Sequence, residues 1–241
     1  MKFSVIIPAH NEEELIVSTI AELCLALKGR FDYEVVVVDD YCTDRTCELV
    51  KQVQQDEPRV KLVRNENRNG FGMAIRCGLK NYSGDAVCIY MADASDSSED
   101  LIRYFELIEN GAECVFGSRF MSGSVVKAYP KHKLLLNRFV NLVLCLFFRH
   151  KFNDTTNAFK CYRKEVIDGC QPFISRHFNL TIELPLKAVI RGYKFEVIPI
   201  SWTNRAAGVS KLKLKEMGSR YFFTFVYCLL EKWLTGKDYK R

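Results

Sequence analysis

Short apolar runs alternate with longer amphipathic stretches through the first half of the chain. Runs rich in Val and Ile occur at residues 3–7, 34–38, 60–63, 86–91 and 114–116. The stretches between them carry apolar residues at helical spacing. We expect helices near residues 12–28, 43–55, 71–81 and 99–110. This alternation predicts an α/β fold with a mostly parallel central sheet and helices on both faces.

The pattern changes after residue 120. Residues 134–148 form an apolar stretch whose only polar stripe consists of Asn137, Arg138 and Asn141. A helix that is apolar on nearly all sides must be buried or lie against lipid. Residues 195–200 predict another strand, and residues 216–234 predict a second helix rich in Phe, Tyr and Leu. The apolar runs reach about half of the ~20 residues that a spanning helix needs, so we expect at most peripheral contact with a membrane.

Charge separates the carboxyl-terminal end from the rest of the chain. The net charge is +6, and residues 205–241 carry nine Lys or Arg residues against three Asp or Glu, so the first 204 residues are neutral overall. We expect a catalytic domain over residues 1–210, which includes the helix near 134–148, followed by a basic, aromatic-rich helix and tail over 211–241. The basic end suggests an anionic ligand or surface, although a solvated tail gives the same pattern. Nucleic acid is not among the expected partners.

The ten cysteines do not form the pattern of a disulfide framework. Most lie inside apolar runs, and no Cys-x-x-Cys pair occurs, so neither disulfides nor zinc are expected. The first residues read as a short strand without the features of a signal peptide. We therefore expect reduced thiols and a cytoplasmic location.

Acidic residues follow two of the predicted strands. Ligands of open parallel sheets bind beyond the carboxyl ends of the strands. Asp39 and Asp40 follow the second strand and suit the base or ribose of a nucleotide; Asp44 and Thr46 resemble the opening turn of a helix, which is the alternative reading.

A second acidic group follows the run at residues 86–91. Asp93, Ser95 and Asp96 form an oxygen-rich cluster that suits Mg²⁺ or Mn²⁺. Capping of the helix that starts near residue 99 is the alternative, because Ser97 and Ser98 are typical of helix starts.

Two further segments are candidates for phosphate binding. The glycine-bearing turn at Gly70 does not follow a strand with the spacing of a dinucleotide fingerprint, which argues against a dehydrogenase. Arg205, Ser210 and Lys211 lie in a basic loop that can close over phosphates or remain a solvated surface loop. Asp154 begins another polar loop.

Taken together and in this order, these segments resemble the family 2 glycosyltransferases of the GT-A fold, and especially the branch that includes dolichol-phosphate mannose synthase. The matching residues are 5–12, 38–40, 43–46, 70–78, 93, 117–119, 154–159 and 205–211. Single motifs of this kind are common, but the whole ordered set is specific.

The resemblance implies a role for each matching residue. The nucleotide pocket would consist of Pro8, Ala9, Glu12, Asp39, Asp40, Gly70 and Asp93. Asp93 corresponds to the last acid of the family's Asp-x-Asp motif and would hold the metal, completed by Ser95 or Asp96. Phosphates of donor or acceptor would bind Arg119, Arg138, Arg205, Ser210 and Lys211. Asp154 would lie near the acceptor.

Two positions depart from the family pattern. Met91 stands where the first acid of Asp-x-Asp is expected, and Tyr41-Cys42 replaces the usual Gly-Ser after the paired aspartates. A module that binds a nucleotide sugar without turnover therefore stays an alternative.

We expect an inverting, single-displacement transfer from a GDP- or UDP-sugar, with Mg²⁺ or Mn²⁺. The two apolar helices and the basic tail favour a polyprenyl phosphate at the cytosolic face of a membrane as the acceptor. If the acceptor is instead a sugar hydroxyl in a glycan, Asp154 or Asp96 would be the general base. The catalytic residues would be Asp93, Asp154, Arg119 and Arg205. The apolar helices also suit a membrane-protein partner or a homo-oligomer.

Overall fold

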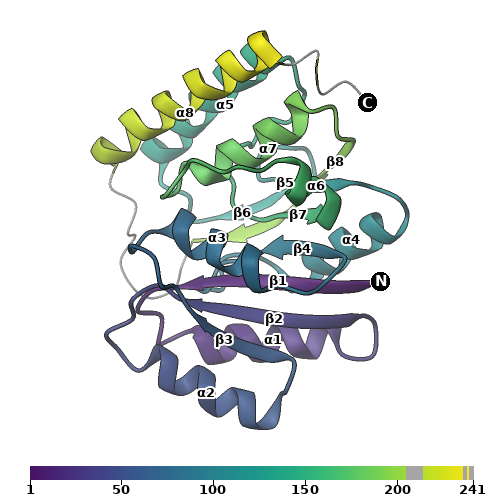
Figure 1. Ribbon diagram of the computed structural model, residues 1–241, viewed down its shortest axis with the longest axis vertical. Coiled ribbons are helices and arrows are strands. Elements are labelled where there is room, and N and C mark those ends of the chain that lie inside the picture. The colour runs from purple at the N-terminus through teal and green to yellow at the C-terminus, as the bar shows by residue number, and fades with distance from the viewer. Residues whose placement is uncertain (205–213, 236–237, 239–241) are drawn as a thin grey trace.

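The computed structural model describes residues 1–204, 214–235 and 238, and in them one large sheet crosses the molecule (Figure 1). Its strand order is β3-β2-β1-β4-β7-β5-β8. The strands are β1 (Lys2–Ala9), β2 (Asp32–Asp39), β3 (Val60–Arg64), β4 (Ala86–Ile89), β5 (Cys114–Ser118), β7 (Lys160–Arg163) and β8 (Phe195–Pro199). All neighbours pair in parallel except β7, which is antiparallel to both β4 and β5. The mostly parallel sheet predicted from the sequence is confirmed.

Strand β7 is the element of this sheet that the hydrophobic pattern does not predict. It has only four residues, and it begins with a lysine whose side chain is fully buried. The ammonium of Lys160 donates hydrogen bonds to the carbonyl oxygens of Thr155 (3.0 Å), Thr181 (3.3 Å) and Asn157. Backbone carbonyls thus replace water around this charge, which is why a polar residue can occupy the centre of the sheet.

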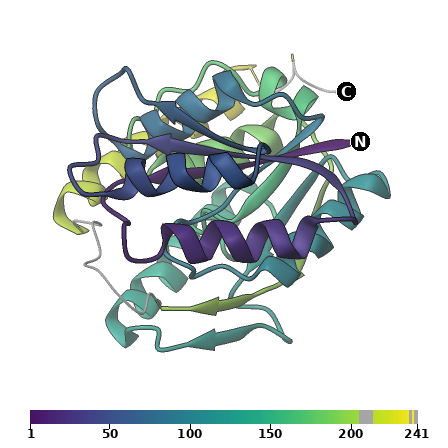
Figure 2. The same ribbon diagram turned by 90° about the horizontal axis from the view of Figure 1, so that it is seen from below.

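Helices cover both faces of the sheet, as expected. One face packs against α1 (Ile16–Leu27), α2 (Thr46–Asp56) and α4 (Ser98–Glu109), and Figure 2 shows α1 in dark purple along that face. The other face packs against α3 (Phe71–Asn81), α6 (Lys164–Gly169) and α7 (Leu180–Ile190). Helix α7 is buried at every position from Leu180 to Ala188, so it lacks the one-sided apolar stripe by which a surface helix is recognised.

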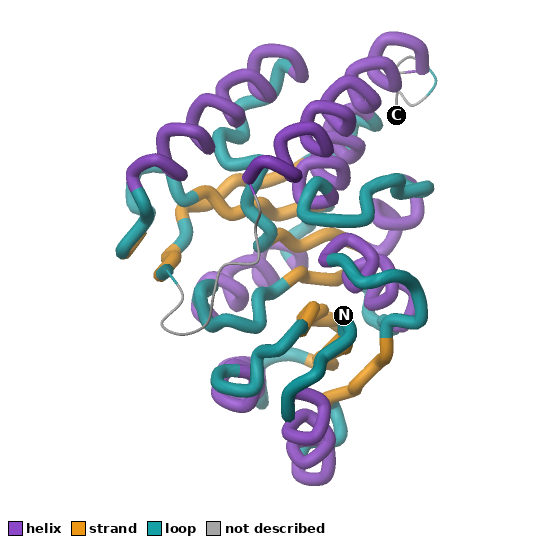
Figure 3. The backbone as a smooth tube through the Cα atoms, turned by 90° about the vertical axis from the view of Figure 1, so that its left-hand side faces the viewer, coloured by secondary structure: helices purple, strands orange, loops and turns teal. Residues whose placement is uncertain are grey.

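Two long helices lie side by side outside α7, at the top of Figures 1 and 3. They are α5 (Lys131–Phe148) and α8 (Leu214–Thr235), close to the ranges predicted for them. They share a small core with α7 made by Leu144, Phe148, Ile182, Leu186 and Cys228. No helix among the described residues is long and apolar enough to cross a bilayer. Beside the start of α5, β6 (Val125–Lys127) and β9 (Ser201–Thr203) pair as a short parallel ribbon.

The outer surfaces of α5 and α8 remain strongly apolar. Their exposed large side chains are Leu135, Leu136, Phe139, Leu142, Leu146, Phe147, Phe222, Phe223, Leu230, Trp233 and Leu234. We call this set the α5/α8 apolar face. It is far larger than the scattered apolar residues of an ordinary surface, which marks it as a contact surface.

A buried carboxylate joins the amino ends of β1 and β2. Glu34 accepts hydrogen bonds from the hydroxyl of Ser4 (2.6 Å), the ammonium of Lys61 (2.6 Å) and the backbone and side chain of Ser83. Burial acts to raise the pKa of Glu34, but these hydrogen bonds outweigh it and lower the pKa to about 2. The ionised form therefore stabilises the fold.

Replacing Glu34 with Gln should lower the free energy of unfolding by about 2 kcal/mol at neutral pH, because charged hydrogen bonds are lost from a buried site. In the wild-type protein the ionised Glu34 carboxylate contributes its full share of the free energy of unfolding above about pH 4.5. This share is lost as the pH falls toward 2, since the folded-state pKa is lowered. Urea unfolding across that range measures it. Glu48→Gln, in an exposed pair with Arg45, is the control and should change stability by less than about 0.5 kcal/mol. Equal acid sensitivity of wild type and Glu34→Gln would refute the assignment.

Candidate active site

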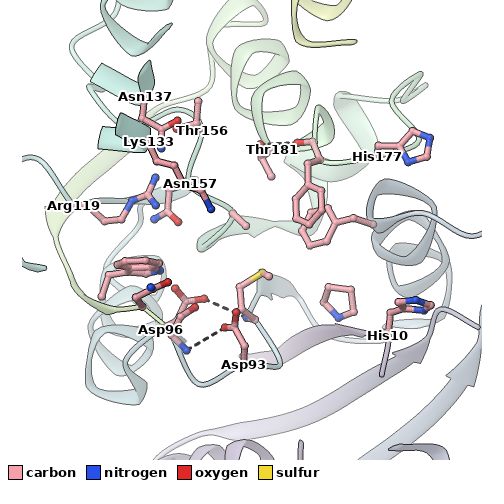
Figure 4. Close-up of a pocket in the computed structure, with 18 of the residues that line it drawn as sticks. His10, Asp93, Asp96, Arg119, Lys133, Asn137, Thr156, Asn157, His177 and Thr181 are labelled. Atoms are coloured by element: carbon pink, nitrogen blue, oxygen red, sulfur yellow. Dashed lines mark hydrogen bonds between the residues drawn. The ribbon is translucent and has the colours of Figure 1, made fainter. Parts of the chain in front are cut away.

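The carboxyl ends of β1, β4 and β5 border a cavity of about 680 Å³. Its lining brings together most of the sequence-predicted site residues: Pro8, Ala9, Glu12, Asp40, Gly70, Asp93, Ser95, Asp96 and Arg119. Figure 4 shows Asp93 and Asp96 on one side of the cavity and Arg119 and Lys133 on another. The cavity therefore places a pair of acids opposite a group of cations.

One wall depends on contacts between Asp40 and Gly70. The carboxylate of Asp40 accepts hydrogen bonds from the backbone N–H of Gly70 (3.0 Å) and the side-chain amide of Asn65 (2.8 Å). Gly70 has a φ of 152°, and a Cβ atom there would lie 2.6 Å from the carbonyl oxygen of Arg176. Only glycine fits this close approach. Asp40 and Gly70 thus shape the wall, consistent with the expectation that both belong to the pocket.

Asp39 lies beside this cavity and is not part of its lining. Its side chain is half-buried, and Oδ1 accepts the backbone N–H of Cys42 at 2.8 Å. The helix-start reading of Asp44 is confirmed, because its carboxylate accepts the N–H of Thr46 (3.0 Å) at the start of α2. The Thr46 hydroxyl in turn accepts the N–H of Glu12 (2.9 Å), which connects this turn to the cavity.

A tight turn after β4 brings the two predicted metal ligands together. The backbone N–H of Met91 donates to Asp96 (3.2 Å), and the N–H of Ser95 donates to Asp93 (3.2 Å). Between them, Ala94 has a φ of 54°. Burial, and next the neighbouring Asp93, raise the pKa of Asp96 to about 7. Both carboxylates line the cavity rather than capping α4.

The acidic pair has the chemistry of a site for a hard divalent cation. Carboxylate and hydroxyl oxygens are the ligands that Mg²⁺ and Mn²⁺ prefer, and a cation relieves the repulsion that raises the pKa of Asp96. Within the described residues, no third carboxylate, imidazole or thiol completes a close group of three here. The thioether of Met91 is a soft ligand, so Ser95, water and a substrate phosphate would supply the remaining oxygens if a cation binds here.

Arg119 is fixed by a buried ion pair. Its Nε and Nη2 atoms each lie 2.8 Å from an oxygen of Asp154, and its backbone N–H donates to the same carboxylate at 2.9 Å. Asp154 is completely buried and is not part of the cavity lining. Burial acts to lower the pKa of Arg119, but Asp154 outweighs it and raises the pKa, so the guanidinium stays charged. Asp154 therefore positions Arg119 from behind.

Aromatic rings surround the same guanidinium. The Cζ atom of Arg119 lies 5.4 Å from the ring centres of Phe120 and Tyr129 and 5.7 Å from that of Trp202. These rings exclude water from the charge and strengthen its interactions. Tyr129 and Trp202 carry no motif in the sequence, and they reach the site only because β6 and β9 pair beside α5.

The three residues of the polar stripe of α5 have different surroundings, and Asn137 is the one that lines the cavity. Asn141 donates to the hydroxyl of Thr156 (3.1 Å), and its amide oxygen accepts the N–H of Thr156 (3.3 Å). Arg138 lies instead at an adjoining hollow of about 420 Å³, 5.3 Å from the ring of Phe120. The cavity also includes residues that the sequence motifs do not identify: Tyr129, Lys133, His177, Thr181, Trp202, Arg220 and Tyr221. Arg205, Ser210 and Lys211 lie outside the described residues.

The chain matches the family described as "Glycosyl transferase family 2" over residues 4–178. It belongs to this family. It is 32% identical over 235 residues to dolichol-phosphate mannosyltransferase of Pyrococcus furiosus, covering 97% of this chain and 64% of that protein. It is 30% identical over 217 residues to polyprenol monophosphomannose synthase of Mycolicibacterium smegmatis, covering 86% and 80%. The chain thus spans less than two thirds of the Pyrococcus protein.

A solved structure of glucosyl-3-phosphoglycerate synthase from Mycobacterium tuberculosis, in complex with Mn²⁺, UDP and glucosyl-3-phosphoglycerate, matches with a TM-score of 0.72 at 19% identity. The match covers 96% of this chain and 79% of that one. At this identity the likeness concerns the fold, and it confirms the GT-A architecture expected from the sequence.

The raised pKa of Asp96 predicts a pH dependence of metal binding by this family 2 glycosyltransferase. A carboxyl group must lose its proton to bind a cation, so Mn²⁺ affinity should rise from about pH 6 to about pH 8 with release of a proton. Asp96→Asn should weaken binding about tenfold or more and flatten this profile. Calorimetry in buffers of different ionisation enthalpy measures both. Glu99→Gln, an exposed acid at the start of α4, is the control. A pH-independent affinity in the wild type would contradict the prediction.

Proposed function

We propose that the protein transfers a hexose from a nucleoside-diphosphate sugar to a polyprenyl phosphate, by a single displacement that inverts the anomeric carbon. The observation that carries the proposal is the cavity in which Asp93 and Asp96 lie opposite Arg119 and Lys133. An acidic pair with a divalent cation suits a diphosphate, and separate cations suit a second phosphate. The names of the two relatives, a dolichol-phosphate mannosyltransferase and a polyprenol monophosphomannose synthase, support this acceptor class.

On the donor side, Asp93 and Asp96 would hold Mg²⁺ or Mn²⁺, with Ser95 beside them. When bound, the cation neutralises the charge that develops on the departing nucleoside diphosphate. Pro8, Ala9 and Glu12 would contact the nucleoside, and GDP- and UDP-sugars are the donors to test. The Mn²⁺ and UDP of the Mycobacterium tuberculosis synthase support a donor of this kind.

On the acceptor side, the fixed charge of Arg119 would orient the acceptor phosphate. A phosphate oxygen is already ionised near neutral pH, so the attack needs no general base. Both oxygens of Asp154 are engaged by Arg119, which makes Asp154 a positioning residue in this mechanism. Lys133 and Arg220, which also line the cavity, add positive charge where the acceptor would enter.

The α5/α8 apolar face would lie on the cytosolic surface of a membrane. Helix α5 contributes Lys133, Leu136 and Asn137 to the cavity while it exposes Phe139 and Leu142 on the apolar face. A polyprenyl chain could therefore stay in lipid while its phosphate reaches Arg119. Exposed Lys131 begins α5, and exposed Arg149 and Lys151 follow its end. These cations favour anionic lipid at roughly 1 kcal/mol each. A membrane-protein partner or a second copy could use the same face.

Replacing Asp154 with Asn tests the acceptor chemistry. It should leave measurable transfer to dolichyl phosphate, with a raised KM for the acceptor and an unchanged pH profile, because Asp154 only orients Arg119. Arg119→Lys should lower kcat/KM about 100-fold, since a lysine cannot make the two side-chain hydrogen bonds to Asp154 that fix the charge. Assays use GDP-mannose and UDP-glucose with and without Mn²⁺, and thermal unfolding checks that each variant is folded.

Arg45→Lys, on the exposed start of α2, is the matched control for the arginine substitution and should retain full activity. Loss of the acidic limb of the pH profile in Asp154→Asn would instead assign Asp154 as a general base. No turnover by the wild type with any donor would favour a nucleotide-sugar-binding module.

Sedimentation with lipid vesicles tests the membrane contact. The wild type should bind vesicles that contain anionic lipid at low salt and bind less as salt rises. Phe139→Glu combined with Phe222→Glu should abolish binding, because two charges enter the α5/α8 apolar face. Leu25→Glu is the control: Leu25 is 80% exposed on α1, which covers the sheet from the other side. Absence of wild-type binding at low salt would defeat the membrane claim.

A further inference from the structure

Two thiols and a carboxylate converge between the end of β2 and the first turn of α2. One carboxylate oxygen of Asp39 and the Sγ atoms of Cys42 and Cys47 all lie within 4.8 Å of one another. All three side chains are half-buried, so they are partly shielded from solvent but still accessible to an ion. No other three His, Cys, Asp or Glu side chains in the described part of the chain converge this closely.

The ligand set differs in kind from that of the acidic pair. Thiolates are soft ligands that favour Zn²⁺ and related ions, whereas Mg²⁺ and Mn²⁺ favour oxygen. Zinc binds sulfur at about 2.3 Å in tetrahedral geometry, which separates two sulfur ligands by about 3.8 Å. Shifts of about an ångström would therefore bring both thiols and the carboxylate onto one ion. Four residues separate the cysteines, a spacing within the range of structural zinc sites.

Local structure holds the three groups in place. The N–H of Cys42 donates to Asp39 (2.8 Å), which keeps the carboxylate beside that residue. Cys47 lies in the first turn of α2, and burial, followed by the neighbouring Asp39, raises the pKa of its thiol. The Sγ atom of Cys42 lies 3.4 Å from the carbonyl oxygen of Ala9, which lines the large cavity. The thiol group is thus in direct contact with the wall of that cavity.

We propose that Asp39, Cys42 and Cys47 form a binding site for a thiophilic divalent cation of the zinc class, separate from the Asp93–Asp96 pair, with solvent as the fourth ligand. Occupation of this site draws the Cys42 thiol, which contacts the carbonyl oxygen of Ala9, toward the ion and changes the adjoining wall of the cavity. It therefore competes with nucleotide binding. This second statement rests on the proposed function, which gives Ala9 a nucleoside contact.

Titration of the reduced protein with Co²⁺ tests the site without any assay of activity. Tetrahedral thiolate ligation should produce a sulfur-to-cobalt absorption band together with visible d–d bands, and Zn²⁺ should abolish both. Cys42→Ser and Cys47→Ser should each weaken binding about tenfold or more, because a ligand is lost. Cys145→Ser, at a half-buried thiol of α5, is the matched control and should leave the spectrum unchanged.

Asp93→Asn should also leave the cobalt spectrum unchanged, because the two sites are separate. Circular dichroism checks the fold of each variant. The absence of thiolate bands in the wild type would overturn the proposal. Bands that survive in both Cys42→Ser and Cys47→Ser would overturn it as well.

Calorimetry of UDP and GDP in excess Mg²⁺, with and without Zn²⁺, tests the competition. Zinc should weaken nucleotide binding to the wild type and to Cys145→Ser but not to Cys42→Ser. Zinc inhibition that persists in Cys42→Ser would place the effect at the acidic pair and overturn the competition. Absence of nucleotide binding in the zinc-free wild type would instead count against the proposed function, while the cobalt spectra still decide the site.

Discussion

The buried contact between Arg119 and Asp154 is the interaction on which the rest of the site depends. Removing two charges from water is costly, and the attraction between them often no more than offsets that cost, so the pair contributes little to stability. The pair matters because it fixes the position of the guanidinium. Three hydrogen bonds from Arg119 to one carboxylate fix the guanidinium at the end of β5. Aromatic rings close around it, and its charge faces the cavity that also contains the acidic pair.

The loop that carries Asp154 is itself held from two sides. Below it, the ammonium of Lys160 binds the carbonyl oxygens of Thr155 and Thr181, which joins the loop to β7 and α7. Burial lowers the pKa of Lys160 to about 7, so this anchor loses charge as the pH rises above neutrality. On the other side, Asn141 of α5 pairs with Thr156. An antiparallel strand within a parallel sheet thus supports a loop at the cavity.

Sequence patterns predicted the part of the fold in which apolar strands alternate with amphipathic helices. The runs of β1, β2 and β4 are continuous and apolar, and polar residues at their carboxyl ends converge because parallel strands end together. Strand β7 and helix α7 escaped prediction for opposite reasons: β7 is short and contains a buried lysine, and α7 is buried all round. Its place after a strand predicted Asp93, and the family resemblance predicted Arg119. Neither could show that both oxygens of Asp154 are engaged by Arg119. Spacing also could not show that Cys42 meets Cys47, because that contact depends on how the chain turns into α2.

Helix α5 has residues that line the cavity along one side and exposed apolar side chains along the other. Eighteen residues of helix measure about 27 Å, which is close to the thickness of a bilayer core. The polar side chains of Asn137 and Asn141 nevertheless oppose insertion of α5 across the bilayer. If the helix lies flat on a leaflet, collisions with lipid-borne acceptors take place in two dimensions. Turnover would then follow the number of acceptor molecules per unit area of membrane and not their bulk molarity.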